Sequence, residues 1–157
     1  MPTYVISMEE ALWGSVLVAI TMVIHGTGMF SILRVVRALK ERFEPMKSFF
    51  GGLSLVILSS LLIIFTNVLE VMVWAAFFLL QDAQPNHSVA LYNALLNYTT
   101  VQAGYLPQHW HLLEALLAMA GLLTGAWSTG ILYMLAKDFQ DAQLRRETHD
   151  RSPDWWS

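Results

Sequence analysis

The sequence predicts an all-α integral membrane protein with three transmembrane helices and a short re-entrant helix and loop between the last two. Of its 157 residues, 55% are hydrophobic and 13% are charged, whereas soluble domains carry about 25% charged residues. Three apolar segments are each long enough for a spanning helix, which needs about 20 residues. A polar stretch, residues 97–107, lies between the second and third of these segments and is too polar to span a membrane.

Changes in polarity divide the chain into seven segments. They are an extracytoplasmic N-terminus (1–10), a first transmembrane helix (11–38), a basic cytoplasmic loop (39–52), a second transmembrane helix (53–81), a pore helix and filter-like loop (88–107), a third transmembrane helix (109–136) and a cytoplasmic tail (137–157). Pro45 and the pair Gly51-Gly52 are expected to break the helices on either side of the basic loop. The tail is expected to stay helical to about His149.

Each expected span is almost free of charge. Residues 11–33 contain no Lys, Arg, Asp or Glu, residues 53–80 contain one charge at Glu70, and residues 112–136 contain one at Glu114. Apolar runs of this length are typical of helices that cross a bilayer. We therefore expect the lipid bilayer to be the main partner of the chain.

The basic residues indicate an orientation. All nine lie in two regions, the first connection and the tail: Arg34, Arg37, Lys40, Arg42 and Lys47, then Lys137, Arg145, Arg146 and Arg151. With three spans these regions share one side of the membrane, and the positive-inside rule makes that side the cytoplasm. The prediction is a multi-pass protein of the cell (inner) membrane, with the N-terminus outside and the C-terminus in the cytoplasm.

The polar stretch has the layout of a re-entrant pore loop. An amphipathic run, residues 88–96, leads into it, and a new helix opens at residues 109–111. Non-helical backbone at membrane depth is tolerated only where protein or a water-filled cavity surrounds it. The neighbouring spans are therefore expected to enclose this stretch.

The residues of this region resemble a known family. Ala90-Leu91-Tyr92 and Tyr98-Thr99-Thr100-Val101, followed by Trp110, Gly121-Leu122-Leu123 and Trp127-Ser128-Thr129, are similar to the pore module of bacterial potassium-channel-like proteins, the two-transmembrane ion-channel family. The resemblance covers about residues 55–136. It implies a homotetramer in which four pore loops surround one axis and the last helix lines a cavity. It also implies passive permeation of a monovalent cation, K⁺ or Na⁺, with no other cofactor.

The candidate selectivity filter departs from the family pattern, which reads Thr-Thr-Val-Gly-Tyr-Gly-Asp. The resemblance assigns the filter to Thr99, Thr100, Val101, Gln102, Ala103 and Gly104. Gln102 stands where the first filter glycine belongs and Ala103 where the aromatic residue belongs. Rings of backbone carbonyls replace the hydration shell of the ion in such filters, and a non-glycine residue is strained where φ is positive. We therefore expect an altered filter without a regular multi-site potassium ladder.

The third span contains several glycine and hydroxyl residues. The resemblance makes Gly121 a hinge for gating, with Gly125 in the same region, and Thr124 and Ser128 share one helix face that would line the cavity. Close helix packing is the alternative for the glycines. Bonds to their own helix backbone are the alternative for the hydroxyls.

Two ionisable residues lie inside the first two spans. At about 1.5 Å per residue, His25 lies roughly 20 Å from the outer start of its helix and Glu70 roughly 18 Å from the outer end of its own. A carboxylate at the centre of a span costs roughly 2.5–3.5 kcal/mol, so the two are predicted to pair. Three roles are open for these residues. The pair could hold two helices together, Glu70 could bond the back of the pore helix instead, or the pair could sense or pass protons.

Several function classes are excluded or disfavoured. There are no cysteines, so disulfides, thiolate metal sites and a cysteine nucleophile are excluded. A net charge of −3 indicates no nucleic-acid partner. With no phosphate-binding loop and no nucleophile–base spacing, we expect no enzyme and no catalytic residue. His109, His111 and Glu114 are expected to form a solvated vestibule in preference to a metal site. The alternative to a channel is a non-conducting membrane scaffold or accessory subunit that keeps the channel fold.

Overall fold

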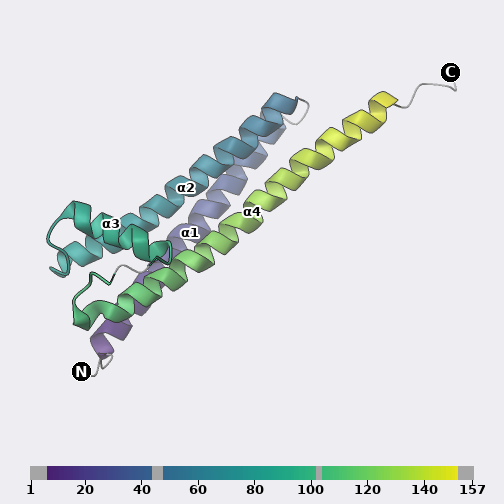
Figure 1. Ribbon diagram of the computed structural model, residues 1–157. Helices are drawn as coiled ribbons and strands as arrows, with labels where there is room; N and C mark the ends of the chain where they lie inside the picture. The colour runs from purple at the N-terminus through teal and green to yellow at the C-terminus, as the bar shows by residue number, and fades with distance from the viewer. Residues whose placement is uncertain (1–6, 44–47, 102–103, 152–157) are drawn as a thin grey trace, which may run out of the picture.

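Three long helices run side by side and a short fourth helix packs against one end of them (Figure 1). The computed structural model describes residues 7–43, 48–101 and 104–151. Its elements are α1 (Met8–Phe43), α2 (Phe49–Leu80), α3 (His87–Tyr98), the 3₁₀ turn η2 (Gln108–Trp110) and α4 (His111–Arg151). These ranges contain no strand. The all-helical architecture predicted from the sequence is therefore confirmed for this part of the chain.

Three of the helices are long and apolar enough to cross a membrane. The candidate spans are Met8–Arg42, Phe49–Leu80 and Gln108–Arg146. Large apolar side chains remain exposed along their outer faces, as Leu61, Ile64 and Phe65 do on α2. Such faces suit a hydrocarbon solvent and not water. By length and composition the chain is a multi-pass membrane protein.

The helices exceed the spans expected from hydropathy. The first span was expected over 11–38, yet α1 covers Met8–Phe43, with acidic residues in its first turn and basic residues in its last turn. Those charges complement the partial charges at helix ends. The expected break at Gly51-Gly52 is wrong, because α2 begins at Phe49 and Gly52 is buried inside it. Pro45 lies outside the described residues.

Two apolar clusters hold the bundle together, one near each end. The first surrounds Trp74, Phe78 and Leu113 and includes the buried face of α3. The second includes Met29, Ile63, Ile131 and Leu135, from α1, α2 and α4. Figure 1 shows α3 at the end of the bundle where the N-terminus lies, while α4 continues beyond α2 at the other end.

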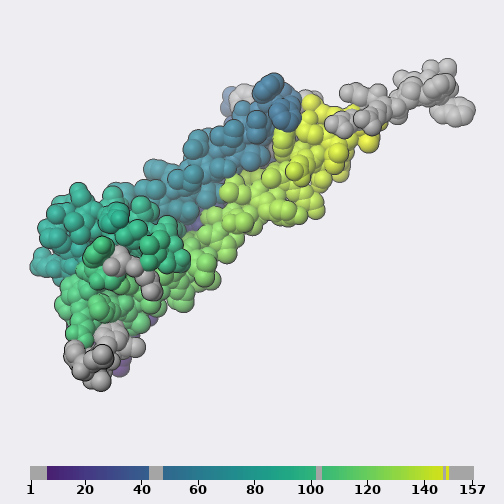
Figure 2. Space-filling view, in the orientation of Figure 1, coloured from purple at the N-terminus to yellow at the C-terminus, as the bar shows by residue number. Residues whose placement is uncertain are grey.

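Contacts at that second end fix the start of the α4 extension. The ammonium of Lys40 lies 2.8 Å from a carboxylate oxygen of Asp138. The rings of Phe49 and Phe139 have centroids 5.6 Å apart. The space-filling view shows α2 and α4 side by side at this end (Figure 2). The expected helical tail is thus a direct continuation of the third span.

Candidate functional site

The short helix α3 is positioned by its first residue and by its buried face. The Asn86 side chain caps it by accepting a hydrogen bond of 3.0 Å from the backbone N–H of Val89. Its buried positions include Ala90, Ala94 and Tyr98, four residues apart, and these face α2 and α4. Residues at this spacing share one helix face. The spacing therefore orients the Tyr98 side chain into the bundle.

The contribution of the Asn86 cap to the stability of α3 can be tested by substitution. Asn86→Ala is expected to destabilise α3 by about 1 kcal/mol, because an N–H of the first turn loses its acceptor. Hydrogen exchange of the amides in 87–98 should become several-fold faster. Ser88→Ala is the control, since Ser88 is exposed in the same turn. Equal exchange rates in the two variants would show that the cap does not hold α3.

Tyr98 joins three helices through its hydroxyl group. It donates a hydrogen bond of 2.6 Å to Oε2 of Glu70 on α2 and lies 2.6 Å from Oγ1 of Thr124 on α4. A hydroxyl carries one hydrogen, and Tyr98 gives its own to Glu70. All three side chains are at most 8% exposed.

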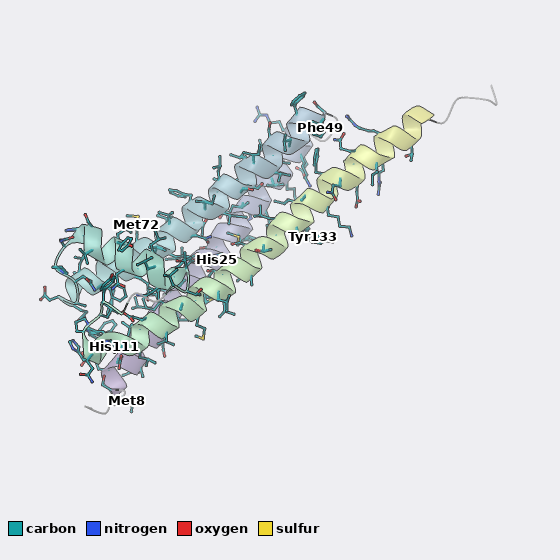
Figure 3. All side chains as sticks on the ribbon, in the orientation of Figure 1. Met8, His25, Phe49, Met72, His111 and Tyr133 are labelled. Carbon is teal, nitrogen blue, oxygen red and sulfur yellow. The ribbon has the colours of Figure 1, made fainter. Side chains whose placement is uncertain are left out.

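His25 extends this arrangement to α1. Its Nδ1 lies 2.8 Å from Oε1 of Glu70, and its Nε2 lies 3.4 Å from the hydroxyl of Ser128 on α4. The side chains of His25 and Glu70 are both fully buried. The structure thus brings together the two residues whose pairing the sequence predicted. Figure 3 shows His25 in the middle of the bundle, level with the end of α3.

We call the five side chains the interhelical polar network: Ser128, His25, Glu70, Tyr98 and Thr124. It links α1, α2, α3 and α4 at one level. Each carboxylate oxygen of Glu70 has one partner, so neither oxygen of the buried acid is left unpaired. A second bond one turn away, 2.8 Å from Trp74 Nε1 to Thr21 Oγ1, joins α1 and α2 again.

The network lies deep in the bundle. Glu70 is ten residues before Leu80, the last residue of α2, and Thr124 is thirteen residues after the start of α4. At 1.5 Å per residue these are depths of about 15 and 20 Å. The hydrocarbon core of a bilayer is about 30 Å thick. The network, and with it the C-terminal end of α3, therefore lies about 15 to 20 Å inside the bundle from this end.

The expected filter begins with a helix-ending turn. The Val101 amide donates to the Leu96 carbonyl and the Thr100 amide to the Asn97 carbonyl, both at 2.9 Å. These two bonds form a Schellman motif. Thr100 occupies its left-handed position with φ of 66°, where glycine is the usual residue. The backbone is therefore strained at Thr100, where nothing in the sequence indicates strain.

The other expected filter residues are exposed or outside the described part. Thr99 and Val101 are exposed, and the Thr99 hydroxyl bonds the Leu95 carbonyl of its own helix. Gly104 is exposed with φ of 64°. Gln102 and Ala103 lie outside the described residues. In a single copy of the chain, the described residues of this segment therefore lie on the surface.

The hydroxyls expected to line a cavity face the interior of the chain. Thr124 is fully buried and Ser128 is 5% exposed, and both belong to the polar network. The Thr124 hydroxyl also lies 3.0 and 3.2 Å from two carbonyls of its own helix, which are alternative acceptors for its single hydrogen. Contacts with α3 and α1 cover these two side chains. They therefore do not lie on the open face of α4, by which we mean the face that no other helix covers.

Gly121 packs directly against α3. A Cβ at this position would lie 2.0 Å from the carbonyl oxygen of Tyr98. Gly125, one turn later, would place a Cβ in open space among the described residues. Helix α4 continues unbroken through both glycines. The structure therefore gives Gly121 a packing contact with the end of α3.

A surface hollow of about 410 Å³ lies between the end of α3 and the open face of α4. The residues lining it come from both helices: Tyr98, Thr99, Thr100, Gly121, Leu122, Gly125, Ala126 and Thr129. Its polar groups are threonine hydroxyls and backbone, and its sides are small or apolar residues. Thr129 lines this hollow, although the sequence predicted a cavity role for its neighbour Ser128 and not for Thr129.

Polar side chains fasten the segment that leads back from α3 to α4. Glu114 accepts a hydrogen bond of 3.0 Å from the Leu106 amide, and His111 Nε2 lies 2.9 Å from the Leu106 carbonyl. Gln84 donates to the Tyr105 carbonyl at 3.1 Å. Glu10 of α1 accepts from the Leu112 amide in the first turn of α4.

The expected solvated vestibule is wrong for Glu114, which is 8% exposed and binds backbone. Within the described residues, no three His, Asp or Glu side chains are arranged to hold a metal ion. The first turn of α4 is thus a structural anchor for the loop.

Comparisons with known proteins identify no relative: no family model, no curated protein and no solved structure matches the chain.

Proposed function

We propose that the chain is the subunit of a tetrameric cation channel related to potassium channels, with an altered filter that lacks strict potassium selectivity. The observation that carries the proposal is the end of α3, which Tyr98 fastens inside the bundle through Glu70 and Thr124. We place this end near the middle of the membrane. A helix that ends there must be followed by a chain that returns to the same side, and such backbone needs protein or water around it. Loops of this kind line pores.

The hollow beside α3 supports a shared axis. In a fourfold assembly, four copies of the hollow between α3 and α4 would face one another around a central cavity. Thr99, Thr100 and Thr129 would then supply hydroxyls to that cavity. Thr129 and Gly125 replace Thr124 and Ser128 as the proposed cavity residues of α4, because the latter pair is buried inside the chain. K⁺ or Na⁺ would cross passively.

The proposed location is the cell (inner) membrane, with the N-terminus outside and the basic end of the bundle in the cytoplasm. In the structure, Arg34, Arg37, Lys40 and Arg42 lie on the last turns of α1, at the end opposite α3. The positive-inside rule then gives the orientation. The filter segment opens to the outside.

Ion flux through the purified protein in liposomes tests the proposal. We expect comparable uptake of K⁺ and Na⁺ down their gradients, because a filter without its glycines cannot form a regular ladder of carbonyl rings. Thr129→Phe should lower flux at least tenfold by filling the proposed cavity. Ser15→Phe is the control, since Ser15 is also exposed and also bonds the carbonyl four residues back.

The alternative is a non-conducting scaffold or accessory subunit that keeps this fold. Its support is Gln102, which stands where the first filter glycine belongs. Absence of flux from a folded, tetrameric protein, unchanged in Gln102→Gly, would favour the scaffold. Flux of K⁺ with Na⁺ excluded would contradict the altered-filter account, and equal flux in Thr129→Phe and Ser15→Phe would contradict the proposed cavity.

A further inference from the structure

A groove runs along the membrane face of the α1–α2 pair, away from the polar network. Its volume is about 340 Å³. Its lining comes from both helices: Ile24, Thr27, Gly28, Ser31, Ile32 and Val35 on α1, and Leu62, Phe65, Thr66 and Leu69 on α2. The two helices approach closely at Gly28, where a Cβ would lie 2.6 Å from Thr66 Cγ2.

The groove offers apolar atoms despite its three hydroxyl groups. Thr27 bonds the Val23 carbonyl at 2.8 Å, Ser31 bonds the Thr27 carbonyl at 2.7 Å, and Thr66 bonds the Leu62 carbonyl at 3.0 Å. Each hydroxyl hydrogen is therefore used within its own helix. What remains toward the groove is methyl and methylene surface, which suits a hydrocarbon chain.

The length and position of the groove match one leaflet of a bilayer. From Ile24 to Val35 there are eleven residues, or about 16 Å along the helix axis. Half of the apolar thickness of a bilayer is about 15 Å. The last lining residue on α1 is Val35, next to Arg34, where the charge-free run of α1 ends. One acyl chain would fill the groove from the middle of the membrane to the headgroup level.

Arg34 lies at the headgroup end of the groove. It follows Thr27 by seven residues and Ser31 by three, spacings that share a helix face. Its guanidinium carbon lies 4.4 Å from the centroid of the ring of Phe30, an exposed residue that does not line the groove. The guanidinium therefore lies beside the end of the groove and not inside it. The ion pairs of the described residues, His25–Glu70 and Lys40–Asp138, do not include it. A guanidinium so placed has its donors available for a phosphate.

The other charges on this face favour an anion at Arg34. Arg37 follows by three residues and adds positive charge one turn further. Glu41 follows by seven residues, about 10 Å beyond Arg34 along the axis. It is therefore one turn past the basic pair and does not neutralise Arg34 directly.

We propose that the α1–α2 groove and Arg34 form a binding site for an anionic phospholipid, with one acyl chain in the groove and the phosphate on the guanidinium. Basic residues at the cytoplasmic ends of transmembrane helices recognise such headgroups. The site is independent of conduction, because it lies on α1 and α2 and uses no residue of the filter segment or of the proposed cavity.

Native mass spectrometry of the intact protein, titrated with phosphatidylglycerol or phosphatidylcholine of equal chain length, tests the site. Phosphatidylglycerol is expected to bind more tightly. Arg34→Gln should weaken its binding about fivefold and weaken phosphatidylcholine binding less, because the choline ammonium offsets the charge of the same phosphate group. Arg145→Gln, an exposed arginine on the α4 extension, is the charge-matched control.

A second pair of variants tests the groove. Ser31→Phe should fill it and weaken both lipids, whereas Ser54→Phe should have no effect, since Ser54 is exposed on α2, bonds its own helix and does not line the groove. Equal binding of the two lipids, or equal losses in Arg34→Gln and Arg145→Gln, would overturn the proposal. So would a changed oligomeric mass in Ser31→Phe with lipid binding intact, because a second copy of the chain would then occupy the groove.

Discussion

Glu70→Ala is expected to produce the largest loss of stability among substitutions in the polar network. The carboxylate holds His25 at 2.8 Å and Tyr98 at 2.6 Å in a fully buried position. Its removal takes away the carboxylate oxygens that both partners contact and opens a cavity. Breaking a buried pair from one side costs about 3–5 kcal/mol. Thermal unfolding in detergent should therefore begin at a clearly lower temperature.

Two further variants separate the parts of this effect. Tyr98→Phe keeps the ring and loses bonds to Glu70 and Thr124, and interhelical hydrogen bonds in membranes average about 0.6 kcal/mol each. It should therefore cost about 1–2 kcal/mol. Met72→Ala is the control, because Met72 is two residues from Glu70 and 53% exposed. If Glu70→Ala were no more harmful than Met72→Ala, the network would not hold the bundle together.

Gly121→Ala is expected to displace the end of α3. The new methyl group would lie 2.0 Å from the Tyr98 carbonyl oxygen, and this backbone atom cannot move without shifting the helix. Overpacking of this kind costs about 1–3 kcal/mol. Gly125→Ala is a matched control on the same helix, since its methyl group meets no described atom within 4 Å. It should be neutral, or stabilising by up to about 1 kcal/mol through helix propensity.

The same pair distinguishes packing from hinge bending. If Gly121 acts through packing, Gly121→Ala should lower the unfolding temperature, and hydrogen exchange of 87–98 should become faster. If it acts as a hinge alone, the unfolding temperature should not fall, and ion flux should change without faster exchange in α3. A lower unfolding temperature in Gly125→Ala than in Gly121→Ala would contradict the close contact seen in the structure.

The number and kind of the long helices followed from the sequence because these are local properties. An apolar run of more than 20 residues favours a spanning helix whatever its neighbours are. The approach of His25 and Glu70 was also predictable. Depth along a straight helix is a simple function of residue number, and a buried carboxylate needs a partner.

The fastening of α3 was decided by tertiary structure. In the sequence, Tyr98 is simply the residue before the Thr-Thr-Val stretch. Its role as the hydrogen-bond donor to Glu70 depends on how three helices meet. Its spacing from Ala90 and Ala94 was the signal that this side chain faces the bundle. The strain at Thr100 was equally invisible, because it arises where α3 ends and not from the residue type.

Sequence determined the elements and the level of each residue along them, and packing determined their rotation. Thr124 and Ser128 share a face of α4, as their spacing predicts, but that face turns inward to α1 and α3, leaving Thr129 on the open side. The rotation of a helix about its axis depends on which side chains its neighbours can accommodate. Here the close contact of Gly121 with α3 and the buried hydrogen bonds of Glu70 select it, and both come from residues far apart in the chain.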